Sequence, residues 1–375
     1  MEQIIHIKSP KTGKELWQVS ANLFTDGEVE YPYIDRILYI RDQPKYRDQA
    51  VALLKEDKIT EATALLLRDQ DAFSKQTAPD VKTICGFLKE TPTSLADAMQ
   101  FLNYGPVADY FNARWSSPTF VSGLALMQHI LDKNKKHVEV ACGIGQFLKI
   151  AENNQVQTVG MDVVFSKLWL GRNYLGLKGI LICTDINENY EITIDQPVSA
   201  LCQDALYFLE HKNQVLQKIR SFSQYTTVAV GHCHTDKELE YPNGFPLSYE
   251  QYKALITRES IWITDQTLIK AWLQDLKIEE SNHPEVLQNA KALSWIEGRI
   301  NETIFPLTPP EALRVNPLLS SSDFKVEWPS ESYKKEYVKD YAYLLDTASK
   351  LDTAVDLFQD KQHYYKNRIL IETTV

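Results

Sequence analysis

Hydrophobic and polar positions divide the chain into four stretches with different periods. Residues 1–40 contain short runs that alternate apolar and polar positions, which predicts a small β-unit. Across residues 41–131, apolar side chains recur three and four positions apart, as they do in amphipathic helices. Short apolar runs alternate with helical stretches over residues 132–250, and residues 251–375 again favour helices. We therefore expect a β leader, a helical lid or linker, a core and a helical C-terminal addition.

Five apolar runs of the core have the length of buried strands. They read "HVEVA", "QTVGMDV", "GILICTD", "VSALCQD" and "TTVAVGH". Strands that alternate with helices form a parallel sheet covered by helices. We therefore predict an α/β fold with a Rossmann-like, doubly wound and mostly parallel sheet. Ligands of such sheets bind at the carboxyl ends of the strands, so polar residues that follow a strand are the first candidates for a site.

Composition and charge limit the classes of partner. Of 375 residues, 44% are hydrophobic and 24% are charged, and no apolar run is as long as a membrane helix requires. The start "MEQIIHIKSPKTGKELW" lacks the features of a secretory signal, so we expect a cytoplasmic protein. A net charge of -10 disfavours a broad nucleic-acid-binding face and favours a small-molecule partner. The five cysteines are scattered without a C-x-x-C pair, as buried reduced thiols are.

The segment "VEVACGIGQF" contains a glycine turn after the first core strand. A dinucleotide-binding turn needs a third glycine, but Leu148 stands at that place. The segment instead resembles the first motif of the class I S-adenosylmethionine-dependent methyltransferases, which has an acidic residue, a small residue and Gly-x-Gly. The matching residues are Glu139, Ala141, Cys142, Gly143 and Gly145. Ala141 stands where glycine is commoner. The alternative is a glycine turn that only packs a strand tightly against a helix.

Three later strand ends resemble further motifs of the same family. They supply Asp162 and Val163, then Asp185 and Ile186, and then Gln203 and Asp204. The resemblance implies that Asp162 accepts hydrogen bonds from the ribose hydroxyls of the cofactor. It implies that Asp185 accepts one from the adenine amine, beside an apolar wall. Each acid alone is also a candidate helix N-cap. Four motifs in order indicate the family, with S-adenosyl-L-methionine as cofactor.

The helix expected before the first core strand also belongs to the resemblance. Such a helix often closes over the cofactor in this family. In "YGPVADYFNARW", Tyr110 and Arg114 lie one helical turn apart. Either side chain could reach the methionine carboxylate of the cofactor. The alternative is a packed tyrosine and a solvated arginine.

The leader resembles a second type of domain. "IKSPKTGKEL" and "YPYIDRILYI" are similar to a short zinc-ribbon domain that precedes or partners some methyltransferases. Ser9 stands where that domain has a zinc-binding cysteine, and residues 1–84 contain no cysteine. We therefore expect a metal-free leader that has a structural or substrate-capping role.

Two histidines follow the fifth strand run in "VAVGHCHTDKEL". His232 and His234 lie on the same side of an extended chain. Histidine is the natural base near neutral pH, so we predict that these residues are catalytic, and we favour His232 because it is nearer the strand end. The alternatives are a metal-binding pair aided by Asp236 and histidines that only bond to loop backbone. Our expectation for the site is that it holds no metal.

These observations predict a cytoplasmic S-adenosylmethionine-dependent methyltransferase. The acceptor is expected to be a small molecule or natural-product intermediate, methylated on O, N or C. The Asn/Asp-Pro-Pro-Tyr motif of nucleobase amine methylation is absent, since "QDALYF" stands at that place. Aromatic residues of the C-terminal region are either pocket walls or core: Tyr249, Trp262, Trp272 and Trp295. Two other functions stay open, a catalytically inactive cofactor-binding scaffold and a nucleotide-dependent oxidoreductase.

Overall fold

The computed structural model describes residues 5–69, 77–90, 94–239, 244–281, 283–351 and 356–373. The strands are β1 Ile5–Lys8, β2 Trp17–Ser20, β3 Leu23–Thr25, β4 Glu30–Ile34, β5 Ile37–Tyr39, β6 Lys136–Val140, β7 Gln157–Asp162, β8 Ile180–Cys183, β9 Glu191–Ile194, β10 Val198–Gln203, β11 Thr226–His234, β12 Ser260–Ile263, β13 Ala292–Glu297, β14 Leu313–Val315 and β15 Leu370–Glu372. The α-helices are α1 Pro44–Lys55, α2 Ile59–Leu67, α3 Val81–Lys89, α4 Leu95–Phe101, α5 Pro106–Ala113, α6 Pro118–Ile130, α7 Gln146–Asn153, α8 Phe165–Tyr174, α9 Lys212–Arg220, α10 Tyr249–Ala254, α11 Asp265–Gln274, α12 Pro284–Asn289, α13 Glu331–Tyr337, α14 Ala342–Ala348 and α15 Lys361–Lys366. Three short 3-10 helices are η1 Arg114–Ser116, η2 Leu206–Phe208 and η3 Val338–Asp340.

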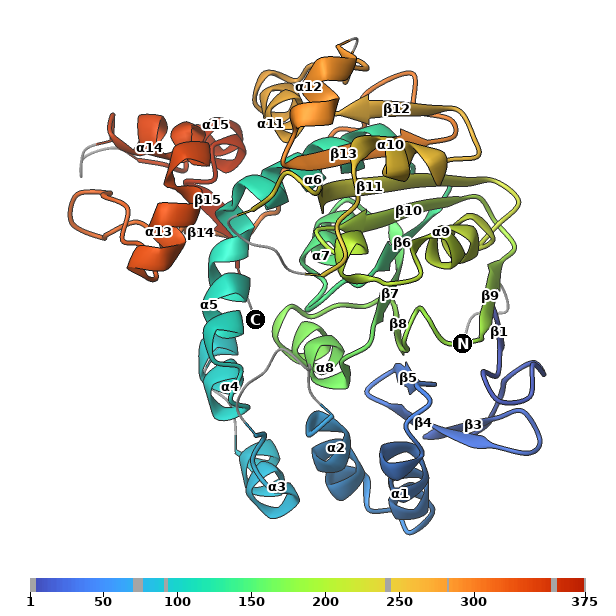
Figure 1. The fold of residues 1–375 in the computed structure, drawn as a ribbon. Coiled ribbons are helices and arrows are strands. Elements are labelled where there is room, and N and C mark those ends of the chain that lie inside the picture. The colour runs from blue at the N-terminus through green and yellow to red at the C-terminus, as the bar shows by residue number, and fades with distance from the viewer. Residues whose placement is uncertain are drawn as a thin grey trace.

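One large sheet runs through the molecule (Figure 1). Its order in the described residues is β12-β13-β11-β10-β6-β7-β8-β5-β4-β3-β2. The strands from β11 to β5 pair in parallel, and β13 lies antiparallel between β11 and β12. The chain starts the core at β6, moves outward to β7 and β8, and then returns to the other side with β10 and β11. That reversal between β6 and β10 is the place where an open α/β sheet binds its ligand. The predicted Rossmann-like α/β fold is confirmed.

Helices cover both faces of the sheet and bury two hydrophobic cores. On one face α6, α7, α8 and α11 pack together, with Phe120, Leu168 and Trp272 fully buried. On the other face α9 and α10 pack against the strands together with the β1-β9 ribbon. The five strand runs expected in the core correspond to β6, β7, β8, β10 and β11. Because both faces are covered, these strands are buried along nearly their whole length instead of at alternate residues.

The leader is joined to the large sheet by its last strand. β5 pairs in parallel with β8, so that Ile37 lies opposite Leu181 and Tyr39 lies opposite Cys183. β4, β3 and β2 then extend the same sheet outward. The leader was expected to end near residue 40, which is one residue after β5. Because β5 belongs to the large sheet, the leader and the core share that sheet.

Hydrogen bonds join two turns of the leader. The Ser9 side chain is buried and its hydroxyl lies 2.7 Å from the Tyr31 hydroxyl. The Thr12 hydroxyl donates to the Asp26 carboxylate at 2.8 Å. The same carboxylate also accepts the backbone N–H groups that follow it. These contacts hold together the turns that begin at Ser9 and Asp26.

The C-terminal region differs from the helical addition that the sequence suggests. β12 and β13 pair antiparallel within it, with α11 and α12 between them in the sequence, and they complete one edge of the sheet, so the core continues past the expected limit at residue 250. The run "ALSWIE" is apolar and short, and such a run has no periodicity that separates a strand from a buried helix. Beyond β13, helices α13 to α15 and the antiparallel pair of strands β14 and β15 pack together (Figure 1).

The last segment contacts η1, which precedes the core. The Arg368 guanidinium donates to the backbone oxygen of Trp115 at 2.7 Å. The Tyr343 hydroxyl donates to the backbone oxygen of Ser116 at 2.5 Å. Arg368 also forms a fully buried ion pair with Glu372. The C-terminal region therefore holds the segment that carries Arg114.

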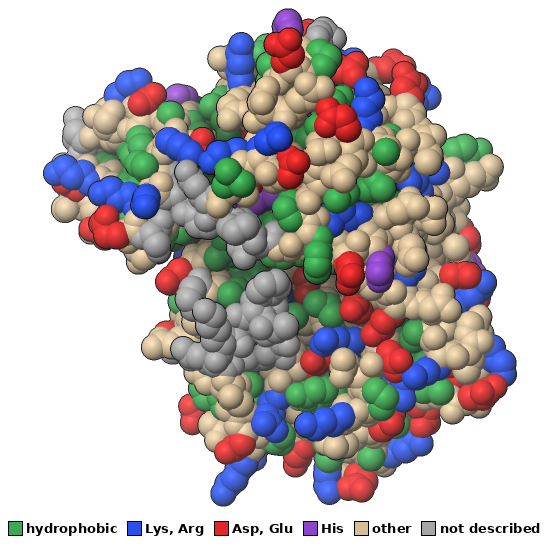
Figure 2. Space-filling view, in the orientation of Figure 1, with side chains coloured by type: hydrophobic (Ala, Val, Ile, Leu, Met, Phe, Trp, Pro, Cys, Tyr) green, Lys and Arg blue, Asp and Glu red, His purple; other side chains and the backbone are tan. Residues whose placement is uncertain are grey.

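The surface agrees with the acidic but mixed composition. On the face that Figure 2 shows, lysines and arginines are interspersed with acidic residues. Among the helices of the described residues, none is both long and apolar enough to cross a membrane.

Candidate active site

A cavity of about 930 Å³ lies at the carboxyl ends of the core strands. Most of the predicted site residues line it: Tyr110, Arg114, Ala141, Gly143, Asp162, Val163, Asp185, Ile186, Gln203, Asp204, His232 and His234. Segments that are far apart in the sequence meet there because parallel strands end at the same edge of a sheet. Glu139 and Gly145 are not among the residues that line the cavity.

The glycine turn has an unusual backbone. Ala141, Gly143 and Gly145 all have positive φ angles, of 55°, 58° and 78°. A side chain at Gly143 would place its Cβ 2.9 Å from the Phe111 ring. Gly145 is the N-cap of α7 and has no room for a side chain beside Leu177. The turn therefore needs glycine at both positions, and Ala141 occupies a conformation that favours glycine.

Asp162 holds the glycine turn against the end of β7. One carboxylate oxygen accepts the backbone N–H of Gly143 at 2.8 Å, and the other accepts that of Val164 at 2.9 Å. Each carboxylate oxygen has a second lone pair, so the group still has acceptor capacity toward the cavity. The expected contact with ribose hydroxyls stays a prediction.

Asp185 follows β8 and lies in the same wall of the cavity. Its carboxylate accepts the backbone N–H and the side-chain amide of Asn187, both at 2.9 Å. Ile186 is buried beside it and supplies an apolar surface to the cavity. This is the pairing of an acid with an apolar wall that the adenine prediction requires.

Asp204 gathers three donors from different elements. The Tyr110 hydroxyl donates to it at 2.8 Å, the Tyr207 hydroxyl donates at 3.0 Å, and Arg114 lies 3.3 Å away. Arg114 is only 9% exposed, and its guanidinium lies over the rings of Tyr110 and Phe147. The alternative of a solvated arginine is therefore wrong. Tyr110 and Arg114 bind Asp204, and their contact with a cofactor stays a prediction.

Gln203 and Glu139 are both buried behind the cavity edge. The Gln203 amide donates to the backbone oxygen of Thr119 at 2.7 Å. Its carbonyl oxygen has no hydrogen-bond partner among the described residues. Burial raises the pKa of Glu139 to about 8, against the opposing effect of the Arg114 charge. Glu139 is therefore a largely neutral acid at neutral pH, beneath the glycine turn.

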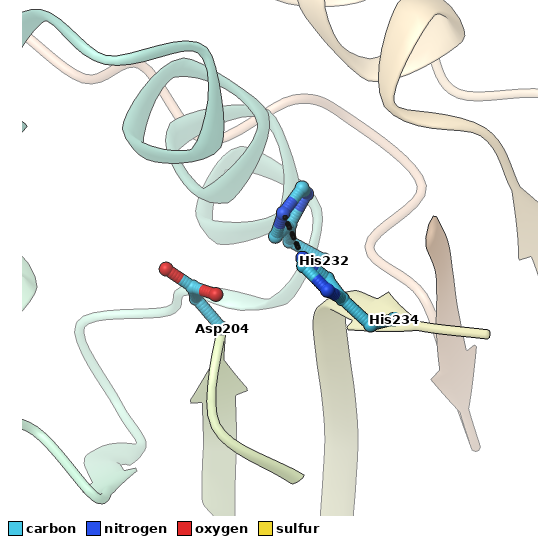
Figure 3. A group of neighbouring side chains, drawn as sticks. All are labelled: Asp204, His232 and His234. Carbon is cyan, nitrogen blue, oxygen red and sulfur yellow. Dashed lines mark hydrogen bonds between the residues drawn. The ribbon is translucent and has the colours of Figure 1, made fainter. Parts of the chain in front are cut away.

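The histidine pair sits on a bulge of β11. The register of β11 against β13 shifts between Val230 and Cys233, and His232 has a φ of 47°. Bulges near active sites redirect side chains. Here the Nε2 atoms of His232 and His234 face one another at 3.1 Å, as Figure 3 shows. The His234 ring also stacks on the Tyr207 ring.

Asp265 binds the second nitrogen of His232. Its carboxylate forms an ion pair with His232 Nδ1, and it also accepts the Ser294 hydroxyl at 3.2 Å. Burial alone lowers the pKa of His232, but the charge and hydrogen bond of Asp265 outweigh it and raise the pKa to about 9. Burial, and then the charge of His232, lower the pKa of His234. The contact between the rings engages the Nε2 atoms of both histidines, and the tautomers decide which ring donates.

Sequence reasoning missed Asp265 and Tyr207. Asp265 follows the apolar strand β12, which is the same signal that identified Asp162 and Asp185. It was hidden because the region was expected to be helical. Lys339 and Asp340 of η3 also line the cavity from the far end of the chain. Asp236, which was considered only in the alternative of a metal-binding histidine pair, is half-exposed and pairs with Lys237.

The C-terminal aromatics are core residues. Trp262, Trp272 and Trp295 are buried, as is Tyr249. None of these four is among the residues that line the described cavity. The interpretation as pocket walls is therefore wrong for these side chains.

Comparison with known proteins gives structural matches alone. No protein-family model and no curated protein matches the sequence. Among solved structures, the chain is similar to the Haloferax volcanii complex that contains the Trm112 methyltransferase activator, at 13% identity and a TM-score of 0.36, covering 57% of this chain and 98% of that one. It is also similar to Haemonchus contortus phosphoethanolamine N-methyltransferase 2, at 14% identity and a TM-score of 0.35, covering 55% of this chain and 60% of that one.

The structural resemblance is to S-adenosylmethionine-dependent methyltransferases. They are the family that the sequence motifs indicate. A third match is the [4+2]-cyclase SpnF, at 15% identity and a TM-score of 0.30, covering 48% of this chain and 78% of that one. At such TM-scores the strand order, and not the matches, carries the fold assignment, and one fold supports several activities.

Proposed function

We propose that this chain is an S-adenosylmethionine-dependent methyltransferase that acts on a small molecule. The observation that carries the proposal is the shared cavity at the carboxyl ends of β6, β7, β8 and β10. It brings together the glycine turn, Asp162, Asp185 with Ile186, and Asp204, which are the segments of the four sequence motifs. A ribose, an adenine and a charged amino acid each find chemically suitable partners along this edge.

The size and lining of the cavity support a small acceptor. Pockets that bury small ligands have volumes of about 300–1,000 Å³, and this cavity lies near the upper end. Space beyond the glycine turn is bounded by the histidine pair and by residues of α11 and η3. We propose that the acceptor lies against His232 and His234 there. Acceptors with a hydroxyl or amine carry a proton on the nucleophilic atom, and the groups at this place have to assist its removal.

Calorimetry tests the cofactor part of the proposal. We expect the protein to bind S-adenosylmethionine and S-adenosylhomocysteine and not NADH. Asp162→Ala should weaken S-adenosylmethionine binding by about 10- to 100-fold, because a charge-assisted acceptor is lost and the glycine turn is freed. Asp195→Ala, at an exposed position, is the matched control. If the folded Asp162→Ala variant binds S-adenosylmethionine as tightly as the wild type does, the ribose does not contact Asp162.

Turnover separates an enzyme from a scaffold. Release of S-adenosylhomocysteine in the presence of a panel of hydroxyl- and amine-bearing metabolites would support transfer. Tight cofactor binding without release for any member of a broad panel would favour the scaffold. Binding of NADH in place of S-adenosylmethionine would favour the oxidoreductase.

A further inference from the structure

Three side chains of the cavity bring potential metal-ligand atoms together. Ligand atoms of Asp204, His232 and His234 all lie within 4.8 Å of one another. The aspartate comes from the end of β10 and the histidines from its neighbour β11. In Figure 3 the carboxylate lies on one side and the two rings lie on the other. The group combines two nitrogen donors with one oxygen donor.

The facing nitrogen atoms of the two rings leave a place for either a proton or a metal ion between them. A neutral imidazole has one N–H and one lone pair. Asp265 accepts from His232 Nδ1, so in the neutral ring the Nε2 atom presents its lone pair. His234 Nε2 faces that atom at 3.1 Å. Two lone pairs at this distance repel one another unless a proton or a metal ion lies with them.

The surroundings hold the ligand atoms in place. Asp265 fixes the His232 ring, and the backbone N–H of His232 donates to Ser294 at 3.0 Å. Hydroxyls of Tyr110 and Tyr207 donate to Asp204. Histidines that bind metals usually have their other nitrogen held by a carboxylate, a carbonyl or water, and carboxylates that bind metals are themselves hydrogen-bonded. His232 and Asp204 meet this rule, whereas His234 Nδ1 has no hydrogen-bond partner among the described residues and its ring is held by stacking on Tyr207. A carboxylate beside two imidazoles completes a set of three ligand atoms, which a proton between the rings alone would not use.

We propose that Asp204, His232 and His234 bind a divalent transition-metal ion such as Zn²⁺. Two imidazoles and one carboxylate suit borderline ions of this kind, whereas Mg²⁺ and Ca²⁺ prefer oxygen ligands. Ligands that bind one such ion at about 2.1 Å lie roughly 3–4 Å apart, which the histidine pair already satisfies. Three protein ligands leave a coordination position for a ligand in the cavity.

The role of the ion rests on the proposed methyltransferase function. An acceptor hydroxyl bound to the metal has a lowered pKa. It releases its proton to solvent, and an oxygen electron pair then forms the bond to the methyl carbon. The bond between methyl and sulfur breaks with its electron pair staying on sulfur. The acceptors expected from this site are therefore small molecules with a hydroxyl that can coordinate a metal.

Metal titration of the full chain tests the site without any cofactor. Protein stripped with chelator and desalted should bind one equivalent of Zn²⁺ in calorimetry. With Co²⁺ it should show the visible absorption of nitrogen-ligated cobalt. His234→Ala and Asp204→Asn should each weaken binding by about 100-fold or more, and Asp265→Asn by about 10- to 100-fold. His6→Ala is the matched control, since His6 lies between Glu15 and Asp195 at the surface.

Circular dichroism shows whether each variant is folded. Two ligand variants are used so that the test still stands if one of them does not fold. Less than one equivalent of metal, or unchanged affinity in folded His234→Ala, would overturn the site and leave a shared proton. Metal-free protein should still bind S-adenosylmethionine and lose turnover until Zn²⁺ is added. Failure of cofactor binding would contradict the methyltransferase proposal and leave the metal result standing.

Discussion

Ala141 has a backbone conformation that its side chain disfavours. Its φ of 55° places an L-residue in the left-handed region, which costs about 1–2 kcal/mol. Glycine avoids this strain, but it loses more chain entropy on folding than alanine does, and this loss offsets part of the gain. Ala141→Gly should therefore stabilise the protein by about 0.5–1 kcal/mol in denaturant unfolding. Ala151→Gly, in the neighbouring helix α7, should have the opposite sign. Destabilisation by both changes would show that the turn is not strained at Ala141.

The ionisation of Glu139, which lies beneath the same turn, makes the stability of the protein depend on pH. Burial raises its pKa from 4.5 to about 8, so its contribution to stability is full below pH 4.5 and is lost as the pH rises through about 8. Glu139→Gln removes this titration. Between pH 5 and pH 8.5 the variant should gain stability relative to the wild type, by a few kcal/mol, on the order of 3. If the difference in unfolding free energy between the variant and the wild type is the same at both pH values, Glu139 stays ionised in the folded protein.

At the scale of elements, the leader acts as an edge cover of the sheet. β5 pairs with β8, and Ile37, Leu38 and Tyr39 are fully buried. Removal of residues 1–40 exposes the β8 edge and its apolar neighbours, and exposed edges associate with other chains. We expect the truncated protein to aggregate in light scattering. Val19→Ser, at an exposed position of the leader, should stay monodisperse. A soluble, folded truncation would show instead that the leader is separable.

Element prediction from the sequence succeeded where flanking signals agreed. The core strands were identifiable as short apolar runs, and β7, β8 and β10 each end at or next to a polar residue. That pattern also identified Asp162 and Asp185. β12 has the same pattern, but the region beyond residue 250 was expected to be helical, and Asp265 was missed for that reason. The meeting of Asp204 with the histidine pair depends on two positive φ angles, at Asp204 and His232, and on a bulge. Local sequence preference does not predict these because neither residue is glycine.

At the scale of the whole molecule, the C-terminal region supports the cavity by holding η1, which carries Arg114. Arg368 and Glu372 form a fully buried ion pair, and Arg368 also holds the backbone of Trp115 next to Arg114. Arg368→Met leaves a buried carboxylate without its cation and should cost about 3–5 kcal/mol in unfolding free energy. It should also weaken S-adenosylmethionine binding, because η1 loses its support.

Two companion variants sharpen this prediction. Lys361→Met changes an exposed cation in the same region and should have little effect on either measurement. The double variant Arg368→Met/Glu372→Leu removes both charges and should recover much of the lost stability. A double variant as unstable as the single one would mean that packing around Arg368, and not the unpaired charge, is responsible for the loss.

The same contacts bear on synthesis by the ribosome. Arg114 leaves the exit tunnel long before Tyr343 and Arg368, which must emerge before η1 can be fixed. A nascent chain that has completed β13 therefore has its whole core sheet and still lacks the support of the segment that carries Arg114. Translation that stops in this interval would leave the segment that carries Arg114 without these contacts, and the ligand edge of the sheet would lack the support that it has in the finished chain.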